Sequence, residues 1–257
     1  MALTRRQLLL GPALALLACR RGTGQRPLRA AAAADLEPAF VELGKQFFID
    51  TGRPVVWSFA SSGQLAQQLD HGAPFDLFAS ANVELVERLR QRGRLVLHSR
   101  RNFARGRLAL WARPGVVPPT GIPDLLRPGL GRIALANPEH APYGQAAVAA
   151  LRSAGIYEAV RARLVFAENV RQALQFAQTG NTDIALTALT LAQREGAYTL
   201  VPATAHPPLI QALGVIRGGD EAGAAELSRY LCGAKGQAIL QKYGFEPAPA
   251  APDPDAL

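Results

Sequence analysis

The chain has 257 residues, a formal net charge of +8 and a hydrophobic content of 49%, which suits one large globular domain or two lobes with their own cores. Only Lys45, Lys235 and Lys242 are lysines, and the arginines are scattered without a basic run interleaved with aromatic residues. This distribution of the basic residues argues against nucleic acid as a partner. Two cysteines, Cys19 and Cys232, supply neither a disulfide framework nor a paired-cysteine metal site.

The N-terminal segment has the pattern of an export signal. Arg5-Arg6 precedes an apolar run at residues 8–18, which is too short to span a bilayer as a helix and is followed by Cys19. The last residues of this stretch resemble a lipobox, in which the cysteine is acylated. We predict a signal peptide at 1–18, a lipid anchor at Cys19, a tether at 19–27 and a periplasmic or extracytoplasmic location. An ordinary signal peptide with a chance cysteine is the alternative, and the arginine pair leaves the export route open between the general and twin-arginine pathways.

Downstream of the tether, the apolar residues alternate between strand-like and helix-like spacing. Expected strands lie at residues 28–33, 55–59, 75–79, 107–111, 132–136, 164–166, 183–187 and 210–216, and another begins at 95–97. Expected helices lie at residues 36–48, around 65–69 and 83–89, and at 144–154, 170–179 and 221–243. This order predicts an α/β fold of mostly parallel sheets with helices on both faces.

Clusters of proline and glycine divide the chain without having the composition of free linkers. We predict two lobes, the first built from residues 28–105 together with 209–245 and the second from residues 106–208. The tail at 246–257 carries four prolines among alanine and aspartate and is predicted to be disordered.

Five segments each place a short polar or glycine turn at the start of a predicted helix. They are AADL (33–36), FASSG (59–63), NPEHAPYG (137–144), ENVR (168–171) and LTALT (186–190). Helix starts leave backbone N–H groups unpaired and carry a partial positive charge, so several of them aimed at one point form a socket for an anion. The pattern favours a binding protein over an enzyme.

These strings, with GAPFDLFASA at 72–81 and YGF at 243–245, carry a family resemblance. In this order and spacing, the chain from residue 28 to residue 245 resembles the periplasmic molybdate-binding proteins of bacterial ABC importers. The resemblance implies a type II periplasmic binding fold with the ligand in the cleft between two lobes. It also implies hinged closure over a tetrahedral oxyanion, with molybdate or tungstate first, and delivery to a permease and its ATPase. No cofactor and no catalysis are implied, and we expect a monomer.

The resemblance also implies which residues hold the anion. In that family, hydroxyls and backbone N–H groups bind the oxyanion without a counter-ion, because neutral donors suffice for an anion that only accepts hydrogen bonds. The matching positions are Ser62, through its hydroxyl and N–H, and Tyr143 and Val170, through their backbone N–H groups. Ser61 is a further candidate beside Ser62.

Two positions depart from the family pattern. Asp35 stands where the family usually has a serine; we expect its side chain to cap the first helix while its backbone N–H faces the anion. Leu186 stands where the family has a pocket tyrosine, and Thr187 or Thr190 is the candidate to replace that hydroxyl, with Thr187 preferred. Both departures lie at the ligand, so they bear on which oxyanion is bound.

Three other functions remain open from the sequence. A serine hydrolase would use Ser62, His140 and Asp35 as nucleophile, base and orienting acid, but no Gly-x-Ser-x-Gly turn surrounds Ser62. A metal transport protein would use His140 and Tyr143, but the sequence lacks paired tyrosines and a His/carboxylate cluster at ligand spacing. A binder of another oxyanion, such as sulfate or a phosphonate, is the strongest rival. His140 itself is expected to fix its loop.

Overall fold

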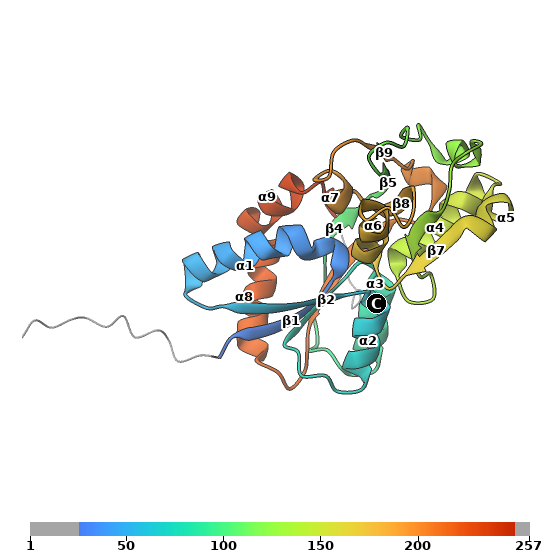
Figure 1. Ribbon diagram of the computed structural model, residues 1–257. Helices are drawn as coiled ribbons and strands as arrows, with labels where there is room; N and C mark the ends of the chain where they lie inside the picture. The colour runs from blue at the N-terminus through green and yellow to red at the C-terminus, as the bar shows by residue number, and fades with distance from the viewer. Residues whose placement is uncertain (1–25, 250–257) are drawn as a thin grey trace, which may run out of the picture.

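The computed structural model describes residues 26–249, and their strands form two five-stranded sheets, one in each of two lobes (Figure 1). The first sheet has the order β2-β1-β3-β10-β4. Its strands are β1 (Leu28–Ala33), β2 (Val55–Ala60), β3 (Leu77–Ser80), β4 (Arg101–Gly106) and β10 (Leu209–Val215). The second sheet has the order β7-β6-β8-β5-β9. Its strands are β5 (Leu108–Ala112), β6 (Ile133–Ala136), β7 (Leu164–Ala167), β8 (Ile184–Ala188) and β9 (Tyr198–Leu200).

Both sheets are mixed, with four strands in one direction and one reversed, so the expected mostly parallel sheets are confirmed with one exception in each. β1 pairs in parallel with β2 and β3, and β6 pairs in parallel with β7 and β8. β10 and β5 are antiparallel to both of their neighbours. Each reversed strand is the one by which the chain enters that sheet from the other lobe, since β5 follows β4 and β10 follows β9. Two interlobe crossings therefore reverse one strand in each sheet.

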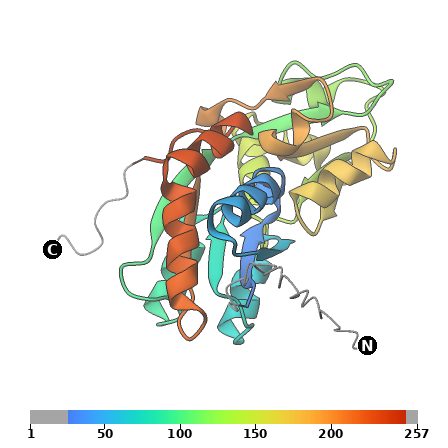
Figure 2. The same ribbon diagram turned by 90° about the vertical axis from the view of Figure 1, so that its left-hand side faces the viewer.

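Helices cover both faces of the first sheet. The longer helices of the protein are α1 (Glu37–Thr51), α2 (Ser62–Asp70), α3 (Val83–Gln91), α4 (Pro142–Ser153), α6 (Val170–Gln178), α8 (Glu221–Cys232) and α9 (Ala234–Lys242). Successive residues of β1 face opposite cores: Ala30 and Ala32 pack with the side chains of α1 and α8, and Ala31 packs with those of α2 and α3. Figure 2 shows α8 and α9 beside the end-on view of α1. Short alanine side chains let the helices on both faces approach this strand closely, which brings their first turns near its end.

In the second lobe, α4 and α6 pack against β6 and β8. Smaller elements complete both lobes: α5 (Tyr157–Val160), α7 (Leu189–Ala192), and the 3-10 turns η1 (Ala34–Leu36), η2 (Ile122–Leu126), η3 (Arg161–Arg163) and η4 (Ala203–Ala205). No helix within residues 26–249 is long and apolar enough to cross a bilayer.

Two predicted elements differ from the structure, and one strand was not predicted. Residues 95–97 form only an isolated bridge from Leu95 to Ile216, and the next strand is β4. The helix predicted over 221–243 is broken at Gly233, whose extended backbone ends α8 and begins α9. The short strand β9 was not predicted.

The ends of the described chain also refine the predictions. The signal peptide, Cys19 and most of the tether lie outside the described residues. The last part of the tether is held, because Arg26 pairs with Asp76 through two hydrogen bonds of 2.7 and 2.6 Å. Glu246, predicted as the first residue of a disordered tail, instead exchanges backbone hydrogen bonds with Arg105 and pairs with Arg107 at 2.6 Å.

Candidate functional site

Four of the five motif segments meet at one small cavity between the lobes. Its lining consists of Ala33, Ala34, Asp35, Ala60, Ser61, Ser62, Ala81, Ala141, Pro142, Tyr143, Asn169 and Val170. The neighbouring parallel strands β1, β2 and β3 end on one side of it and β6 and β7 on the other, so both lobes present helix starts to the same space. Ser62 and Val170, from different lobes, share this cavity, and its lining residues include no lysine or arginine.

Ser62 is positioned as a hydrogen-bond donor. It is the first residue of α2 and 1% exposed, and its backbone N–H therefore has no partner within the helix. Its Oγ accepts a hydrogen bond of 3.0 Å from the N–H of Ala81, which follows β3. Because that bond occupies an oxygen lone pair, the hydroxyl proton stays available for another acceptor. Ala81 was not predicted as a site residue, although the string at 72–81 ends on it.

Ser61 caps α2 and joins the two lobes. Its Oγ accepts from Gln64 N–H at 3.4 Å and lies 2.8 Å from Nδ1 of His140. One residue on, the N–H of Gly63 donates to the carbonyl of His140 at 2.9 Å. His140 therefore fixes its loop, as expected, and it does so against the opposite lobe.

Tyr143 and Val170 bring helix starts from the second lobe. Val170 is the first residue of α6, whose cap Asn169 accepts from the N–H groups of Arg171 and Gln172 at 3.0 and 3.1 Å. Tyr143 lies in the first turn of α4, behind Pro142. Both residues are at most 4% exposed. Their backbone N–H groups fall in first turns, where a helix supplies no acceptor, so binding through these groups stays our prediction.

The Asp35 side chain does not cap a helix, which corrects that prediction. Neither η1 nor α1 has a side-chain cap, and the Asp35 carboxyl, 1% exposed, accepts instead from Nε2 of Gln211 on β10 at 2.8 Å. Burial raises the pKa of Asp35 to about 7, against the opposing effects of Tyr143, Gln211 and its own backbone N–H. Unlike the other buried acid, Asp76, this carboxyl has no ion pair with a described residue.

Two more buried polar groups surround the Asp35 carboxyl. The Tyr143 hydroxyl approaches it closely enough to lower its pKa but makes no hydrogen bond of standard geometry with a described group. Oε1 of Gln211 also lacks a described partner. Both side chains lie against Gly106 at the end of β4, where a Cβ would stand 2.1 Å from the Tyr143 hydroxyl and 3.0 Å from Nε2 of Gln211. Glycine at 106 is therefore required by this close approach at the crossing between lobes.

The fifth motif segment does not line the cavity but makes hydrogen bonds to two residues that do. Thr187 donates its hydroxyl proton to the Val170 carbonyl at 2.9 Å, and Thr190 donates to the Asp35 carbonyl at 2.8 Å. Leu186 is buried in β8. The expectation that Thr187 contacts the anion is thus corrected: its proton is engaged, and it fixes the start of α6.

The hydrolase constellation is not assembled. His140 lies at hydrogen-bond distance from Ser61, Ser62 accepts from Ala81, and Asp35 pairs with Gln211, so no nucleophile–base–acid chain connects the three residues proposed for it. Within the part of the chain that the structure describes, no group of three or more His, Cys, Asp or Glu side chains is placed to hold a metal ion. What the site offers is neutral hydrogen-bond donors.

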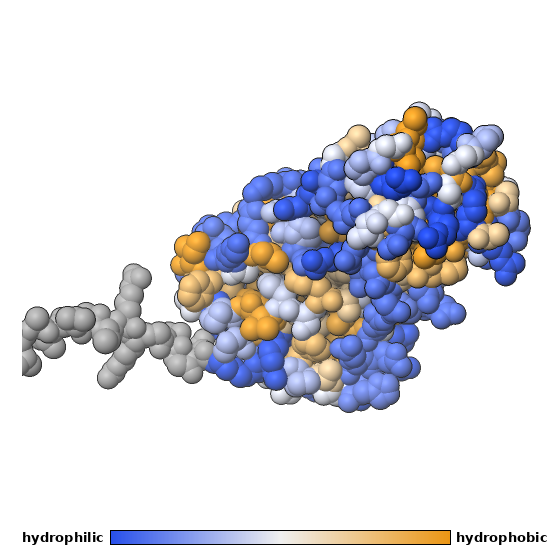
Figure 3. Space-filling model, viewed as in Figure 1, coloured by the Kyte–Doolittle hydropathy of each residue, from blue (hydrophilic) through white to orange (hydrophobic). Residues whose placement is uncertain are grey.

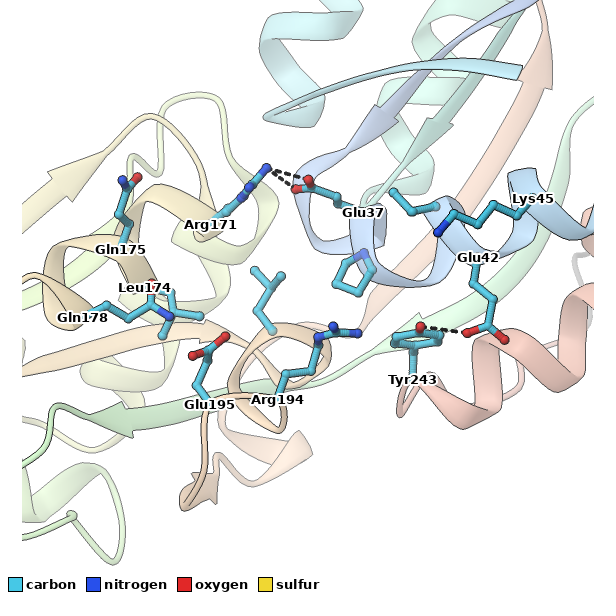
Figure 4. A pocket seen from close by; sticks show the side chains of 13 residues that line it. Glu37, Glu42, Lys45, Arg171, Leu174, Gln175, Gln178, Arg194, Glu195 and Tyr243 are labelled. Atoms are coloured by element: carbon cyan, nitrogen blue, oxygen red, sulfur yellow. Dashed lines mark hydrogen bonds and ion pairs between the residues drawn. The ribbon is translucent and has the colours of Figure 1, made fainter. Parts of the chain in front are cut away.

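A larger groove lies outside the cavity, between α1 and the end of α9 in one lobe and α6 and α7 in the other. Figure 4 shows its charged side chains, with Arg171 of α6 paired to Glu37 of α1 across the lobes and the Tyr243 hydroxyl on Glu42. The Arg171–Glu37 pair is exposed and the Tyr243–Glu42 bond is part-buried, and the surface view in Figure 3 shows hydrophilic residues interspersed with hydrophobic ones on this side of the molecule. The groove therefore carries interlobe contacts, while the converging donors belong to the inner cavity.

Comparison with known proteins supports the motif assignment. A family model described as bacterial extracellular solute-binding protein matches residues 28–246. The chain is 35% identical over 237 residues to the molybdate-binding protein ModA of Azotobacter vinelandii, covering 90% of this chain and 93% of that protein. It is 32% identical over 220 residues to ModA of Rhodobacter capsulatus, covering 84% and 86% of the two chains.

A solved structure agrees. The Azotobacter vinelandii periplasmic molybdate-binding protein matches with a TM-score of 0.79 at 31% identity, covering 85% of this chain and 98% of that one. The resemblance and the two-lobed α/β fold predicted from the motifs are thereby confirmed.

Proposed function

This chain belongs to the bacterial extracellular solute-binding proteins, and we propose that it captures a tetrahedral oxyanion, molybdate or tungstate first, for an ABC importer. The observation that carries the proposal is the shared cavity of Ser62 and Val170, lined by helix starts of both lobes without a lysine or arginine. A dianion there receives charge-assisted hydrogen bonds from donors that are already in place. Tight binding without a counter-ion also leaves the anion free to depart unchanged when the lobes separate.

Hinged closure follows from where these donors come from. Ser62 belongs to the first lobe and Tyr143 and Val170 to the second, so only the closed arrangement lets one anion contact all three. The bound state thus gains interactions that an open state lacks, and ligand shifts the population towards closure. We propose lobe limits of 28–105 with 209–245 and 106–208, with the crossings after β4 and β9 as hinges.

The remaining parts of the proposal concern the location of the protein, its oligomeric state and its transport partners. We propose that the protein acts outside the cytoplasm as a monomer, held by a lipid on Cys19, and hands its ligand to a permease and ATPase of the importer. The relatives named ModA support the oxyanion and the transport role.

A second candidate is a binding protein for another oxyanion, such as sulfate or a phosphonate. It is favoured by Asp35 and Leu186, because the cavity has a carboxyl where the family has a hydroxyl and lacks the hydroxyl of the family's tyrosine. The alternative differs in ligand only, since it uses the same fold and the same donors.

Isothermal titration calorimetry of the purified protein with molybdate, tungstate, sulfate, phosphate and a simple phosphonate tests both candidates. Saturable binding of molybdate or tungstate, with sulfate weaker, supports the first. Preference for sulfate or the phosphonate supports the second. No heat with any of these anions contradicts both, and hydrolysis of p-nitrophenyl acetate that depends on Ser62 would reinstate the hydrolase.

A further inference from the structure

The cavity contains a buried acid that pairs with no cation among residues 26–249. Asp35 lines the cavity together with Ser62 and Val170, its carboxyl is 1% exposed, and its one hydrogen bond of standard geometry comes from the neutral amide of Gln211. An anion held in this cavity adds a second negative charge beside the carboxyl. Two like charges in a site closed to water strongly disfavour each other, so one of them must be neutralised or excluded.

The charged groups on the surrounding elements are engaged elsewhere. Glu37 on α1 pairs with Arg171 on α6 at the exposed groove, and Arg105 and Arg107, before and after Gly106, both pair with Glu246. The groups nearest to Asp35 on β10, α4 and α7 are neutral: Gln211, Tyr143 and Thr190. Burial raises the pKa of Tyr143 well above its usual value and lowers that of His206 near α4, so both are uncharged near neutral pH. His140 faces Ser61.

We propose that the Asp35 carboxyl is protonated when the oxyanion is bound, so that capture of the dianion takes up one proton from solution at this residue. The inference deepens the proposed function and rests on it. In the open protein, water reaches the carboxyl and favours its ionised form. Closure over the ligand removes that water and adds the charge of the anion, and both changes favour the neutral acid.

The surroundings of Asp35 suit the neutral acid. A protonated carboxyl adds one O–H donor, and two nearby oxygen atoms, the Tyr143 hydroxyl and Oε1 of Gln211, are buried without described partners. The raised pKa of Asp35 agrees in direction with this arrangement. A serine at this position would need no such proton. Anion binding should therefore depend on pH with aspartate at position 35 and not with the serine that the family usually has there.

The expected consequence is a dissociation constant for molybdate that rises with pH. In the pH range where Asp35 is ionised in the unliganded protein and neutral in the complex, the dissociation constant rises by up to about tenfold per pH unit, which is the limit for uptake of one proton. A slope that comes from titration of the anion itself would persist in Asp35→Asn, so this variant separates the two sources of pH dependence.

Calorimetry in pairs of buffers with different heats of ionisation measures the proton count directly. The wild-type protein is expected to take up close to one proton per molybdate near pH 8, and Asp35→Asn is expected to take up none and to have a flat affinity across the range. Asp124→Asn is the matched control, because the Asp124 carboxyl receives its hydrogen bonds from Thr120, away from the cavity, and should keep the wild-type slope. Asp35→Ser serves as a second variant if Asp35→Asn fails to fold.

The outcomes separate this inference from the proposed function. Molybdate binding without proton uptake leaves the function standing and overturns the role of Asp35. A wild-type preference for phosphate over molybdate, with binding more than tenfold weaker in both Asp35 variants at every pH, also overturns it, because an ionised carboxylate would then accept a hydrogen bond from a protonated anion. Absence of binding by any tetrahedral oxyanion contradicts the proposed function itself.

Discussion

The contact between Gly63 and His140 makes closure sensitive to a single methyl group. Gly63 is the second residue of α2, and its N–H donates to the His140 carbonyl of the other lobe at 2.9 Å. A Cβ at this position would stand 2.4 Å from that carbonyl oxygen. The partner atom is backbone and cannot rotate away, so Gly63→Ala must hold the lobes apart.

The size of the effect follows from the geometry. An ordinary C···O contact needs about 3.3–3.6 Å, so the lobes must move apart by about 1 Å at this point. The interlobe hydrogen bond is then lost, which costs about 1 kcal/mol, and the donors of the second lobe are displaced from the anion. We expect the dissociation constant for molybdate to rise ten- to a hundredfold, or about 1.4–2.8 kcal/mol. The open, unliganded protein lacks this contact, so the variant should lose no stability there, and alanine is the better helix former.

Calorimetry for affinity, thermal unfolding without ligand and small-angle scattering with ligand test this reasoning together. Gly121→Ala is the control, since its added Cβ makes an ordinary 3.7 Å contact with Pro123 and its backbone is extended. The variant should show weaker binding, an unchanged or higher Tm and less compaction on binding than wild type. Wild-type affinity in Gly63→Ala would refute the claim that this contact forms in the bound state.

Three further predictions concern single side chains. Ser62→Ala should weaken molybdate binding by about 1–3 kcal/mol in calorimetry, because a donor to a charged ligand is lost, while Ser99→Ala, which removes a hydroxyl engaged with Val96, should leave affinity unchanged. Burial would raise the pKa of Asp76, but hydrogen bonds, led by the one from Arg26, outweigh it and hold the pKa at about 2. The ionised acid therefore stabilises the fold above its unfolded pKa near 4, and this contribution is lost as the pH falls towards 2. In acid titrations followed by unfolding, the wild type should lose about 2 kcal/mol of stability that Asp76→Asn does not lose. Arg171→Gln breaks an exposed pair and should change affinity by less than about fivefold in calorimetry, with the difference disappearing in high salt.

Much of the fold was predictable because its signals are local. The run of alanines from Ala30 to Ala33 fits a strand packed between helices on both faces, and Gly52, with φ of 74°, ends α1 three residues beyond the helix predicted at 36–48. The break at Gly233 was missed because the apolar spacing continues across it, although glycine is a residue that often ends helices; α9 then packs against α8.

The cavity was predictable to the extent that it consists of helix starts. Four of five motif segments line it, because each ends a strand at the edge where the lobes meet. Partners far apart in the chain could not be read from spacing. Asp35 and Gln211 are separated by 176 positions, so the expected local cap lost to a long-range hydrogen bond. Thr187 faces α6 because its strand presents that side to the helix, and periodicity alone left the choice of face open.

One of the two departures from the family pattern, Asp35, lies close to the crossing between the lobes. Asp35 comes from η1, Gln211 from the reversed strand β10 and Tyr143 from α4 of the other lobe, and the last two lie against Gly106 at the crossing. A charge on the Asp35 carboxyl therefore interacts with the segment that passes between the lobes as well as with the bound anion. Lobe separation lets water reach the carboxyl, and closure withdraws it from water, so protonation and closure are linked through the same three side chains. The serine of the family has no ionisable proton and could not make that link, which is why the residue at position 35 decides whether closure responds to pH.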